Sequence, residues 1–142
     1  MIGIVIITHG ELASGLKSAA NLLLGETGQF AYAELRLGDN PLDFKSKVDA
    51  VIDEVDSGDG ILVLVDLFGG TPSNTVSQLF ERNDIRALAG VNLPMLVEAI
   101  SSRENSDIDE LANRVMQAGS ESLIDVRQKF IDAAAAEDDE DF

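Results

Sequence analysis

The sequence predicts one α/β domain of three layers: a mainly parallel, doubly wound sheet with helices on both faces and a last antiparallel edge strand. Short apolar runs alternate along the chain with longer segments whose apolar residues recur at a helical period. This alternation is typical of right-handed βαβ units, which build a parallel sheet covered on both faces. The length of 142 residues is sufficient for one domain with a hydrophobic core.

Four short apolar runs are expected to form the parallel strands. An apolar run without polar alternation indicates a strand that is buried on both faces of the sheet. The expected strands are residues 2–7, 30–35, 61–65 and 85–91. The segment from Ser122 to Val126 is expected to be the last strand, on an edge of the sheet, where short and charged strands are found.

Helices are expected between these strands. Residues 12–24 carry an apolar stripe at helical spacing, and Gly25 is expected to end that helix. Asn40 before Pro41 is the typical pairing of an N-cap residue with a proline in the first turn. The expected helices begin near Leu12, Pro41, Pro72, Leu93 and Ile108, the last after a cap at Ser106 or Asp107.

The predicted domain covers residues 1–130, and residues 131–142 form an acidic C-terminal tail. The tail offers few apolar side chains for burial. Segments that cannot bury enough apolar surface to offset the entropy of ordering usually remain disordered, above all at a terminus. We therefore expect the tail to be disordered or a frayed helical extension, and the sequence assigns it no function.

The charge of the chain limits the class of partner. The formal net charge is −16. This argues against a nucleic-acid partner, because affinity for nucleic acid comes largely from basic side chains that meet phosphates. It permits a basic protein partner, because opposite charges speed the encounter of two proteins.

Three absences limit the chemistry and the expected location. The chain has no cysteine, which excludes disulfides, thiolate nucleophiles and cysteine metal ligands, and which fits the cytoplasmic location that we expect. No apolar run approaches the roughly 20 residues of a membrane span. The apolar stretch near the start is short and has no basic residue before it, so a signal peptide is not predicted.

His9 and Asp66 are the residues that the sequence selects for chemistry. His9, the sole histidine, follows the first expected strand, and Asp66 follows the third. Sites in open α/β sheets form at the carboxyl ends of strands, and these two strands are commonly neighbours. A carboxylate that binds one ring nitrogen fixes the tautomer and leaves the lone pair of the other nitrogen free. The alternative interpretation is an exposed loop histidine and an aspartate that caps a turn.

A glycine-rich loop follows the third expected strand and leads into a helix. Gly69 and Gly70 allow backbone N–H groups to turn toward one point. A helix that starts at Pro72 and Ser73 offers unpaired N–H groups and a favourable dipole to an anion, and Thr71 and Ser73 add hydroxyl donors. The loop is a candidate oxyanion or phosphoryl cradle, and a tight strand-to-helix turn is the alternative.

Several other functional classes lack the residues that they require. The sequence contains no P-loop, no dinucleotide-binding fingerprint and no serine nucleophile elbow. A phospho-aspartate receiver needs an acidic pair after the first strand, where this chain has Thr8 and His9. A metal site that combines His9, Asp66 and Glu11 offers few ligands but stays an alternative, and with it a metal-dependent hydrolase.

Three motifs occur in a specific order: THGELASGL at residues 8–16, VDLFGGTPSN at residues 65–74 and AGVNLPM at residues 89–95. Together they resemble the IIA component of the mannose family of the bacterial phosphoenolpyruvate-dependent sugar phosphotransferase system. The likeness covers roughly residues 1–130. The order and spacing of all three motifs make the resemblance specific, which no single motif would be.

The resemblance implies a phosphocarrier. The phosphorylated histidine of the family falls on His9, whose Nε2 would accept a phosphoryl group from phospho-HPr and pass it to a IIB component during sugar uptake. The orienting aspartate falls on Asp66, bound to Nδ1. No metal or organic cofactor is expected. The phosphoryl-binding residues of the family fall on Phe68, Gly69, Gly70, Thr71 and Ser73.

The resemblance also implies partners beyond HPr and IIB. The IIC and IID components in the membrane are indirect partners, and a homodimer is expected in which the last antiparallel strand, Ser122 to Val126, is exchanged between subunits. Some family members are fused to a IIB domain through a linker, and here we expect IIB to be a separate protein. The transported sugar is not predictable, because a IIA component never contacts it.

Two other functions stay open at the level of the sequence. The same histidine can serve a phosphorylation-dependent regulatory module, whose output is binding to another protein. A relative of the same fold donates phosphate to dihydroxyacetone kinase, although its loop motif differs from the sequence of Gly69, Gly70 and Thr71.

Overall fold

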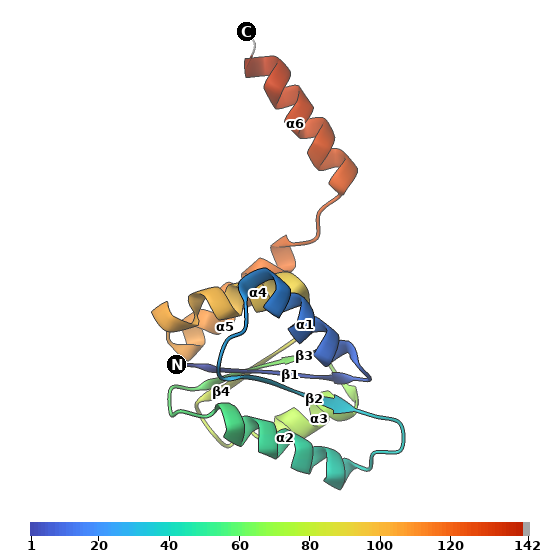
Figure 1. The fold of residues 1–142 in the computed structure, drawn as a ribbon, viewed down its shortest axis with the longest axis vertical. Coiled ribbons are helices and arrows are strands. Elements are labelled where there is room, and N and C mark those ends of the chain that lie inside the picture. The colour runs from blue at the N-terminus through green and yellow to red at the C-terminus, as the bar shows by residue number, and fades with distance from the viewer. Residues whose placement is uncertain (141–142) are drawn as a thin grey trace.

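A computed structural model describes residues 1–140, which form a parallel sheet between two layers of helices (Figure 1). The sheet has four strands in the order β2-β1-β3-β4, and every neighbouring pair is parallel. The predicted α/β class and parallel sheet are therefore confirmed. The strands are β1 (Gly3–His9), β2 (Phe30–Leu35), β3 (Ile61–Val65) and β4 (Ile85–Ala89).

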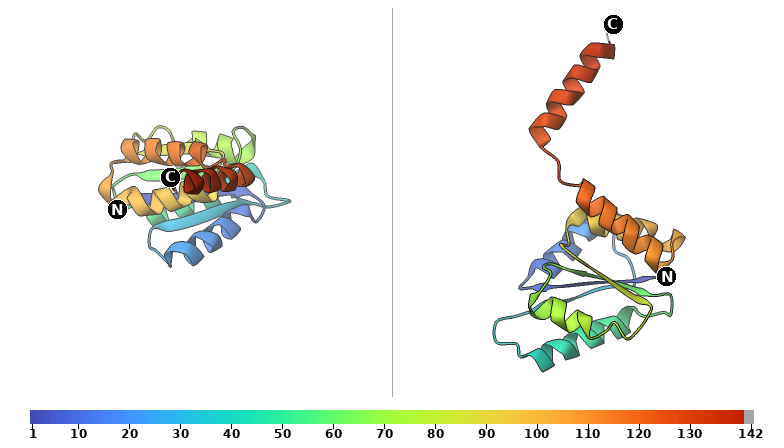
Figure 2. Two further views of the ribbon diagram at one scale, coloured as in Figure 1. Left: turned by 90° about the horizontal axis from the view of Figure 1, so that it is seen from above. Right: turned by 180° about the vertical axis from the view of Figure 1, so that it is seen from behind.

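The helices cover both faces of the sheet, as expected. One face is covered by α1, α4 and α5, and the other by α2 and α3 (Figures 1 and 2). The helices are α1 (Leu12–Leu24), α2 (Pro41–Val55), α3 (Gly70–Ser77), α4 (Leu93–Ser102), α5 (Ile108–Glu121) and α6 (Val126–Glu140), with a short 3-10 helix, η1 (Arg103–Asn105), after α4.

The core consists of two apolar layers that meet at β1. Side chains alternate between the faces of a strand, so Ile4 and Ile6 pack toward α1, α4 and α5 while Val5 and Ile7 pack toward α2 and α3. All four of these residues are fully buried. This double burial explains why the strand reads as a continuous apolar run.

Three helices start close to the residues expected from the sequence, and each has a side-chain cap. Asn40 accepts a hydrogen bond from the backbone of the third residue of α2 at 2.9 Å, and Asp107 does the same for α5 at 2.9 Å. Asn92 caps α4 by accepting from the N–H of Met95 at 3.1 Å. Its amide nitrogen also donates a hydrogen bond to the carbonyl oxygen of Gly119 at 3.4 Å. The motif at residues 89–95 therefore connects α4 to α5.

The predicted antiparallel strand at Ser122 to Val126 is wrong. The N–H of Ser122 donates to Gly119 at the end of α5, residues 123–125 have no regular structure, and Val126 begins α6. Asp125 accepts a hydrogen bond from the N–H of Gln128 at 3.1 Å, which is the contact of a helix start. The residues that follow include a run of alanines with high helix propensity, so the local preference is helical.

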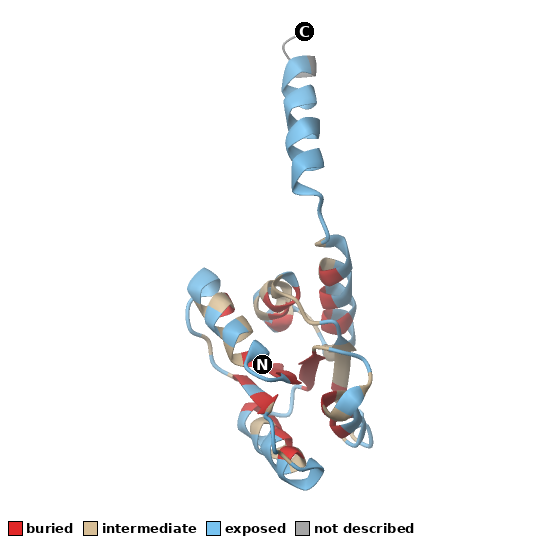
Figure 3. Cartoon of the chain, turned by 90° about the vertical axis from the view of Figure 1, so that its right-hand side faces the viewer, coloured by how far each residue is buried: buried red, intermediate tan, exposed pale blue. Residues whose placement is uncertain are grey.

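The expected acidic tail is helical as far as the structure describes it. Helix α6 leaves the domain through the irregular segment 123–125 and extends away from it (Figure 1). Residues 126–138 are exposed throughout (Figure 3). Within residues 1–140, none of the helices combines the length and apolar character that a membrane span requires.

Two strands, β1 and β4, end at residues other than those predicted, and one difference bears on chemistry. β1 continues through Thr8 to His9, so His9 is the last residue of the strand rather than a loop residue. β4 ends at Ala89 instead of residue 91, because Gly90 adopts a left-handed backbone with φ of 85°. The strand end therefore fixes the backbone of His9 within the sheet.

Candidate functional site

His9 and Asp66 meet at the carboxyl edge of the sheet. β1 lies between β2 and β3, and its Ile7 is level with Val65, the last residue of β3. Asp66 follows Val65 directly, so it emerges beside the end of β1. This is the juxtaposition that the strand order of a doubly wound sheet produces.

The carboxylate of Asp66 binds His9 twice. Oδ2 lies 2.8 Å from Nδ1 of the imidazole and also accepts the backbone N–H of His9 at 3.0 Å. Oδ1 accepts the N–H of Leu67 at 3.0 Å. Because an ionised carboxylate only accepts hydrogen bonds, Nδ1 must be the protonated nitrogen, and Nε2 of the neutral ring carries the free lone pair.

The electrostatics of Asp66 favour its ionised form. Burial on its own raises the pKa of this carboxyl group, since its side chain is only 10% exposed. The hydrogen bonds from the backbone and ring of His9, the positive charge of that ring when it is protonated, and the hydrogen bond from Leu67 oppose burial and outweigh it. The pKa of Asp66 consequently lies below its ordinary value of 3.8.

The start of α3 lies against the free nitrogen of His9. Gly70 is the first residue of α3, and a Cβ atom added to it would be 3.6 Å from Nε2 of His9. Gly70 has φ of 78°, and Gly69 before it has φ of 90°. These left-handed conformations suit glycine, and together they bring the backbone of the helix start close to the imidazole without an intervening side chain.

The N-terminus of α3 is open, whereas that of α1 is occupied. No side chain caps α3, so its first N–H groups remain available to an anion. In α1, Oγ1 of Thr8 accepts the N–H of Ala13 at 2.9 Å, and Oε2 of Glu34 accepts the N–H of Ser14 at 3.0 Å. Of the two helices that start at this edge after β1 and β3, α3 is therefore the one with free donors.

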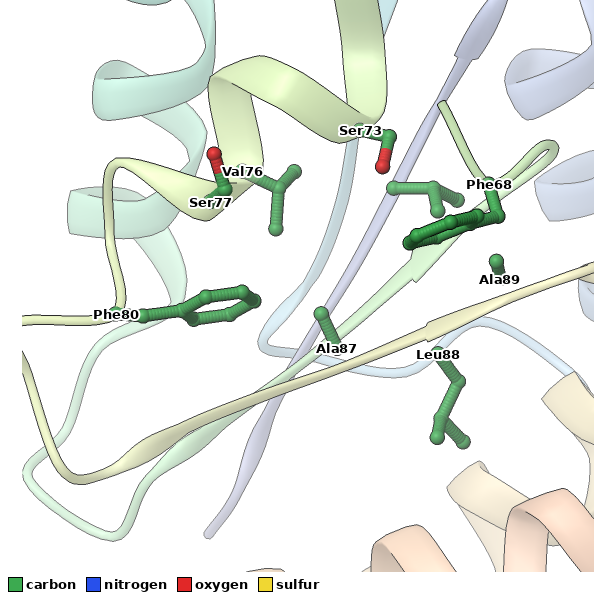
Figure 4. A pocket seen from close by; sticks show the side chains of 9 residues that line it. Phe68, Ser73, Val76, Ser77, Phe80, Ala87, Leu88 and Ala89 are labelled. Atoms are coloured by element: carbon green, nitrogen blue, oxygen red, sulfur yellow. The ribbon is translucent and has the colours of Figure 1, made fainter. Parts of the chain in front are cut away.

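The five residues predicted to bind a phosphoryl group fall into two sets. Gly69, Gly70 and Thr71 are at the start of α3, where Thr71 is half-buried. Phe68 and Ser73 line a cavity of ≈ 180 Å³ between α3 and β4 (Figure 4). The rest of its lining is mostly apolar.

Glu34 is a polar residue of this edge that the sequence reasoning missed. Its side chain is only 3% exposed and lies on β2, with its Cα opposite Thr8 of β1. The available signal was a single charged residue inside an otherwise apolar strand, where a carboxylate is costly unless it has partners. Its main partner, Ser14, is distant in sequence, so only the fold reveals the contact.

The structure does not bring together the three side chains that the sequence offers as metal ligands. Among residues 1–140, no group of three or more histidine, aspartate or glutamate side chains is placed to hold a metal ion. Glu11 has Arg36 as its charged neighbour, with 3.8 Å between Oε1 and the guanidinium. His9, Asp66 and Glu11 therefore do not form a three-ligand cluster.

This arrangement is suited to reversible attachment of an anionic group. The imidazole is 44% exposed, so a second protein can reach it. Its oriented lone pair is a nucleophile, and the open start of α3 offers N–H donors and a helix dipole beside it. Catalysis of phosphoryl transfer depends mainly on such positioning and electrostatic stabilisation.

A family model agrees with this geometry. The model described as PTS system fructose IIA component matches residues 3–116, which include β1, the loop after β3 and the start of α4. The match therefore covers most of the chain and contains all three sequence motifs.

Two curated relatives are similar along most of this chain. The PTS system mannose-specific EIIAB component of Escherichia coli (strain K12) is 35% identical over 136 residues, covering 94% of this chain and 42% of that protein. The PTS system fructose-specific EIIA component of Bacillus subtilis (strain 168) is 29% identical over 124 residues, covering 87% of this chain and 85% of that protein. The chain thus spans less than half the length of the Escherichia coli relative.

Solved structures share the fold. Phosphotransferase system component EIIA from Streptococcus agalactiae has a TM-score of 0.81 at 35% identity, covering 90% of this chain and 99% of that chain. The PTS IIA protein associated with the fucose utilization operon from Streptococcus pneumoniae has a TM-score of 0.81 at 31% identity, covering 90% and 95% of the two chains.

Proposed function

Because this chain belongs to the family of PTS fructose and mannose IIA components, we propose that it is a phosphocarrier in sugar uptake and that His9 carries the phosphoryl group. The donor is the phosphohistidine of HPr, and the acceptor is a IIB component. The membrane components IIC and IID are then indirect partners, and the site of action is the cytoplasm. The relationship of Nδ1 of His9 to Asp66, with Nε2 beside Gly70, is the observation that supports this assignment most strongly.

The transfer step uses the free lone pair of Nε2. This nitrogen attacks the phosphorus atom of the donor, a new N–P bond forms at His9, and the N–P bond of HPr breaks with its electron pair returning to the HPr ring. The His9 ring gains positive charge as the bond forms. The carboxylate of Asp66, 2.8 Å from Nδ1, stabilises that charge.

The start of α3 stabilises the phosphoryl oxygens during this step. Its free N–H groups and dipole attract the negative charge that arrives at Nε2, and Thr71 is the proposed hydroxyl donor. We assign Phe68 and Ser73 to the outer boundary of the same site, since both line the adjoining cavity. The second transfer, to IIB, reverses the first step chemically, so the phosphoryl group must be held without being trapped.

A homodimer with an exchanged C-terminal segment is part of the proposal. β4 is an edge strand, and Leu88 and Ala89 line cavities on both of its faces, of ≈ 180 and ≈ 410 Å³. An open edge of this kind is a site for pairing with another chain. The apolar side chains of Leu123 and Ile124 are exposed after α5 and are candidates to cover it.

Phosphorylation of the purified protein tests the central assignment. We expect a mass gain of one phosphoryl group on incubation with phosphoenolpyruvate, enzyme I and HPr, and no gain in His9→Ala. Omission of HPr is the control for direct transfer from enzyme I. A wild-type protein that stays unlabelled, or a His9→Ala protein that is labelled, would overturn the proposal.

A further inference from the structure

The buried carboxylate of Glu34 holds the start of α1. Its Oε2 accepts the backbone N–H of Ser14 at 3.0 Å and the Oγ hydroxyl of the same residue at 2.8 Å. Its Oε1 accepts a hydrogen bond from the guanidinium of Arg36 at 2.9 Å. Glu34 thereby connects β2 to the first turn of α1 through charge-assisted hydrogen bonds, which are stronger than neutral ones.

The helix that Glu34 holds begins immediately after His9. Only Gly10 and Glu11 separate the last residue of β1 from the first residue of α1. The N–H of Gly10 donates to the carbonyl oxygen of Leu35 at 2.9 Å, which is the residue next to Glu34 on β2. The turn that follows His9 is therefore attached to β2 at Gly10 and, through Glu34, at the start of α1.

The position of Glu34 differs from that of an ordinary cap. Glu11 occupies the N-cap position of α1 but makes no capping hydrogen bond with its side chain. The capping is done instead by Thr8 and Glu34 from neighbouring strands, and Glu34 does so as a buried carboxylate, whose desolvation is costly. Its negative charge lies at the anion-binding end of α1, so of the two helices that start at this edge, α3 is the one that offers free N–H donors to an arriving phosphoryl group.

From these contacts we propose that Glu34 is a positioning residue for phosphoryl transfer at His9. It fixes the turn that follows His9 against β2, and it occupies the start of the competing helix α1, so that the phosphoryl group binds at α3. This inference rests on the proposed function, but its effect on the imidazole exists before any phosphoryl group arrives.

Nuclear magnetic resonance of the free protein tests the positioning directly. His9 is the sole histidine, so the ring nitrogens of an untagged chain give a single, unambiguous pair of ¹⁵N signals. We expect Glu34→Gln to move both ¹⁵N chemical shifts away from their wild-type values, which report the tautomer with the proton on Nδ1. Ser14→Ala should move them in the same direction by a smaller amount. Asp107→Ala is the control, because it removes the cap of α5 without touching β2 or α1.

Transfer kinetics supply the second readout. From phospho-HPr we expect Glu34→Gln to lower kcat by about tenfold, as small misplacements of a reacting group do, with KM near the wild-type value. Asp107→Ala should keep the wild-type kcat even though it is less stable. Wild-type ring signals and a wild-type kcat in both Glu34→Gln and Ser14→Ala would overturn the proposal.

The two readouts separate this inference from the proposed function. If the wild-type protein accepts no phosphoryl group, the phosphocarrier assignment fails, yet the ¹⁵N signals of Glu34→Gln still report whether Glu34 orients His9. If the wild-type protein is phosphorylated and Glu34→Gln matches it in both measurements, only the positioning role of Glu34 fails.

Discussion

Oδ2 of Asp66 accepts two hydrogen bonds from His9, one from ring Nδ1 at 2.8 Å and one from the backbone N–H at 3.0 Å. One carboxylate oxygen therefore fixes both the ring and the backbone of the same residue. This pairing joins the ends of two adjacent strands, and it sets which imidazole nitrogen is free to react.

Asp66→Asn is expected to slow phosphorylation of His9 strongly while it preserves the fold. The amide can present its N–H₂ group to Nδ1, which favours the tautomer with the proton on Nε2 and removes the reactive lone pair. It also removes the negative charge that stabilises the ring. We expect a loss in rate of at least about a hundredfold, on the scale of a wrong tautomer. A rate equal to that of the wild type, measured with phospho-HPr, would exclude Asp66 from the mechanism.

The stability contributed by Asp66 should depend on pH in a defined direction. Its pKa in the folded protein lies below the ordinary value of 3.8, so the ionised form is favoured by folding. That stabilisation is complete well above pH 3.8 and is lost as the pH falls through the folded-state pKa. The free energy of unfolding of wild type minus Asp66→Asn, measured by urea denaturation, should decrease as the pH falls below about 4, where the carboxyl group of Asp66 gains its proton. A difference that grows over this acidic range would contradict the assignment.

Gly70→Ala is expected to impair phosphoryl transfer more than stability. The added Cβ would lie 3.6 Å from Nε2 of His9, in the space that the incoming group needs, and alanine is strained at φ of 78°. Gly38 has φ of 91° with no atom within 4 Å of an added Cβ. Gly38→Ala is therefore a matched control for the strain alone. Equal phosphorylation rates in the two variants would argue against the placement of the phosphoryl group at α3.

We expect Arg103 to contribute to the stability of the fold and not to phosphoryl transfer. It is 2% exposed, and its guanidinium donates to the carbonyl oxygens of Ile2, Gly28 and Gln29 and to the hydroxyl of Thr27. Burial lowers the pKa of Arg103, and the charge of nearby Glu104 opposes this shift only in part.

Replacement of Arg103 should therefore leave several buried acceptors unpaired. We expect Arg103→Met to lower the free energy of unfolding by about 3 kcal/mol, as measured by urea denaturation. Arg86→Met is the control, because Arg86 forms an exposed ion pair with Asp109, which typically contributes less than about 1 kcal/mol. Equal losses in the two variants would show that the buried hydrogen bonds of Arg103 contribute little.

The proposed homodimer can be tested by the molecular mass of the protein in solution. We expect the full chain to have twice the mass of one chain in light scattering after size-exclusion chromatography, and a chain that ends at Ser122 to be a monomer. The physical reason is that the removed segment carries the exposed Leu123 and Ile124, the candidates to cover the edge of β4. A monomeric full chain, or a dimer that survives the truncation, would contradict the exchange.

Much of the site was predictable because it depends on strand ends. The apolar run before His9 and the run before Asp66 are both short and unbroken, and parallel neighbours bring their carboxyl ends together. The glycine pair at residues 69 and 70 likewise predicts a close approach of backbone, which the structure shows at Nε2 of His9.

Other features depended on tertiary contacts that periodicity does not reveal. The contact between Glu34 and Ser14 joins residues 20 positions apart, and the burial of Glu34 follows from the position of α1 over β2. The segment 122–126 has the short apolar pattern of an edge strand, but Asp125 starts a helix and no described strand lies beside the segment to pair with it. A short apolar run alone does not distinguish these outcomes.

The nitrogen that becomes phosphorylated tests the account most directly. After incubation with phosphoenolpyruvate, enzyme I and HPr, long-range ¹H–¹⁵N spectra of the untagged protein identify the ring atom of His9 that bears phosphorus. We predict attachment at Nε2, with Nδ1 still protonated and bound to Asp66. Attachment at Nδ1, or phosphorylation of a residue other than His9, would contradict the central claim.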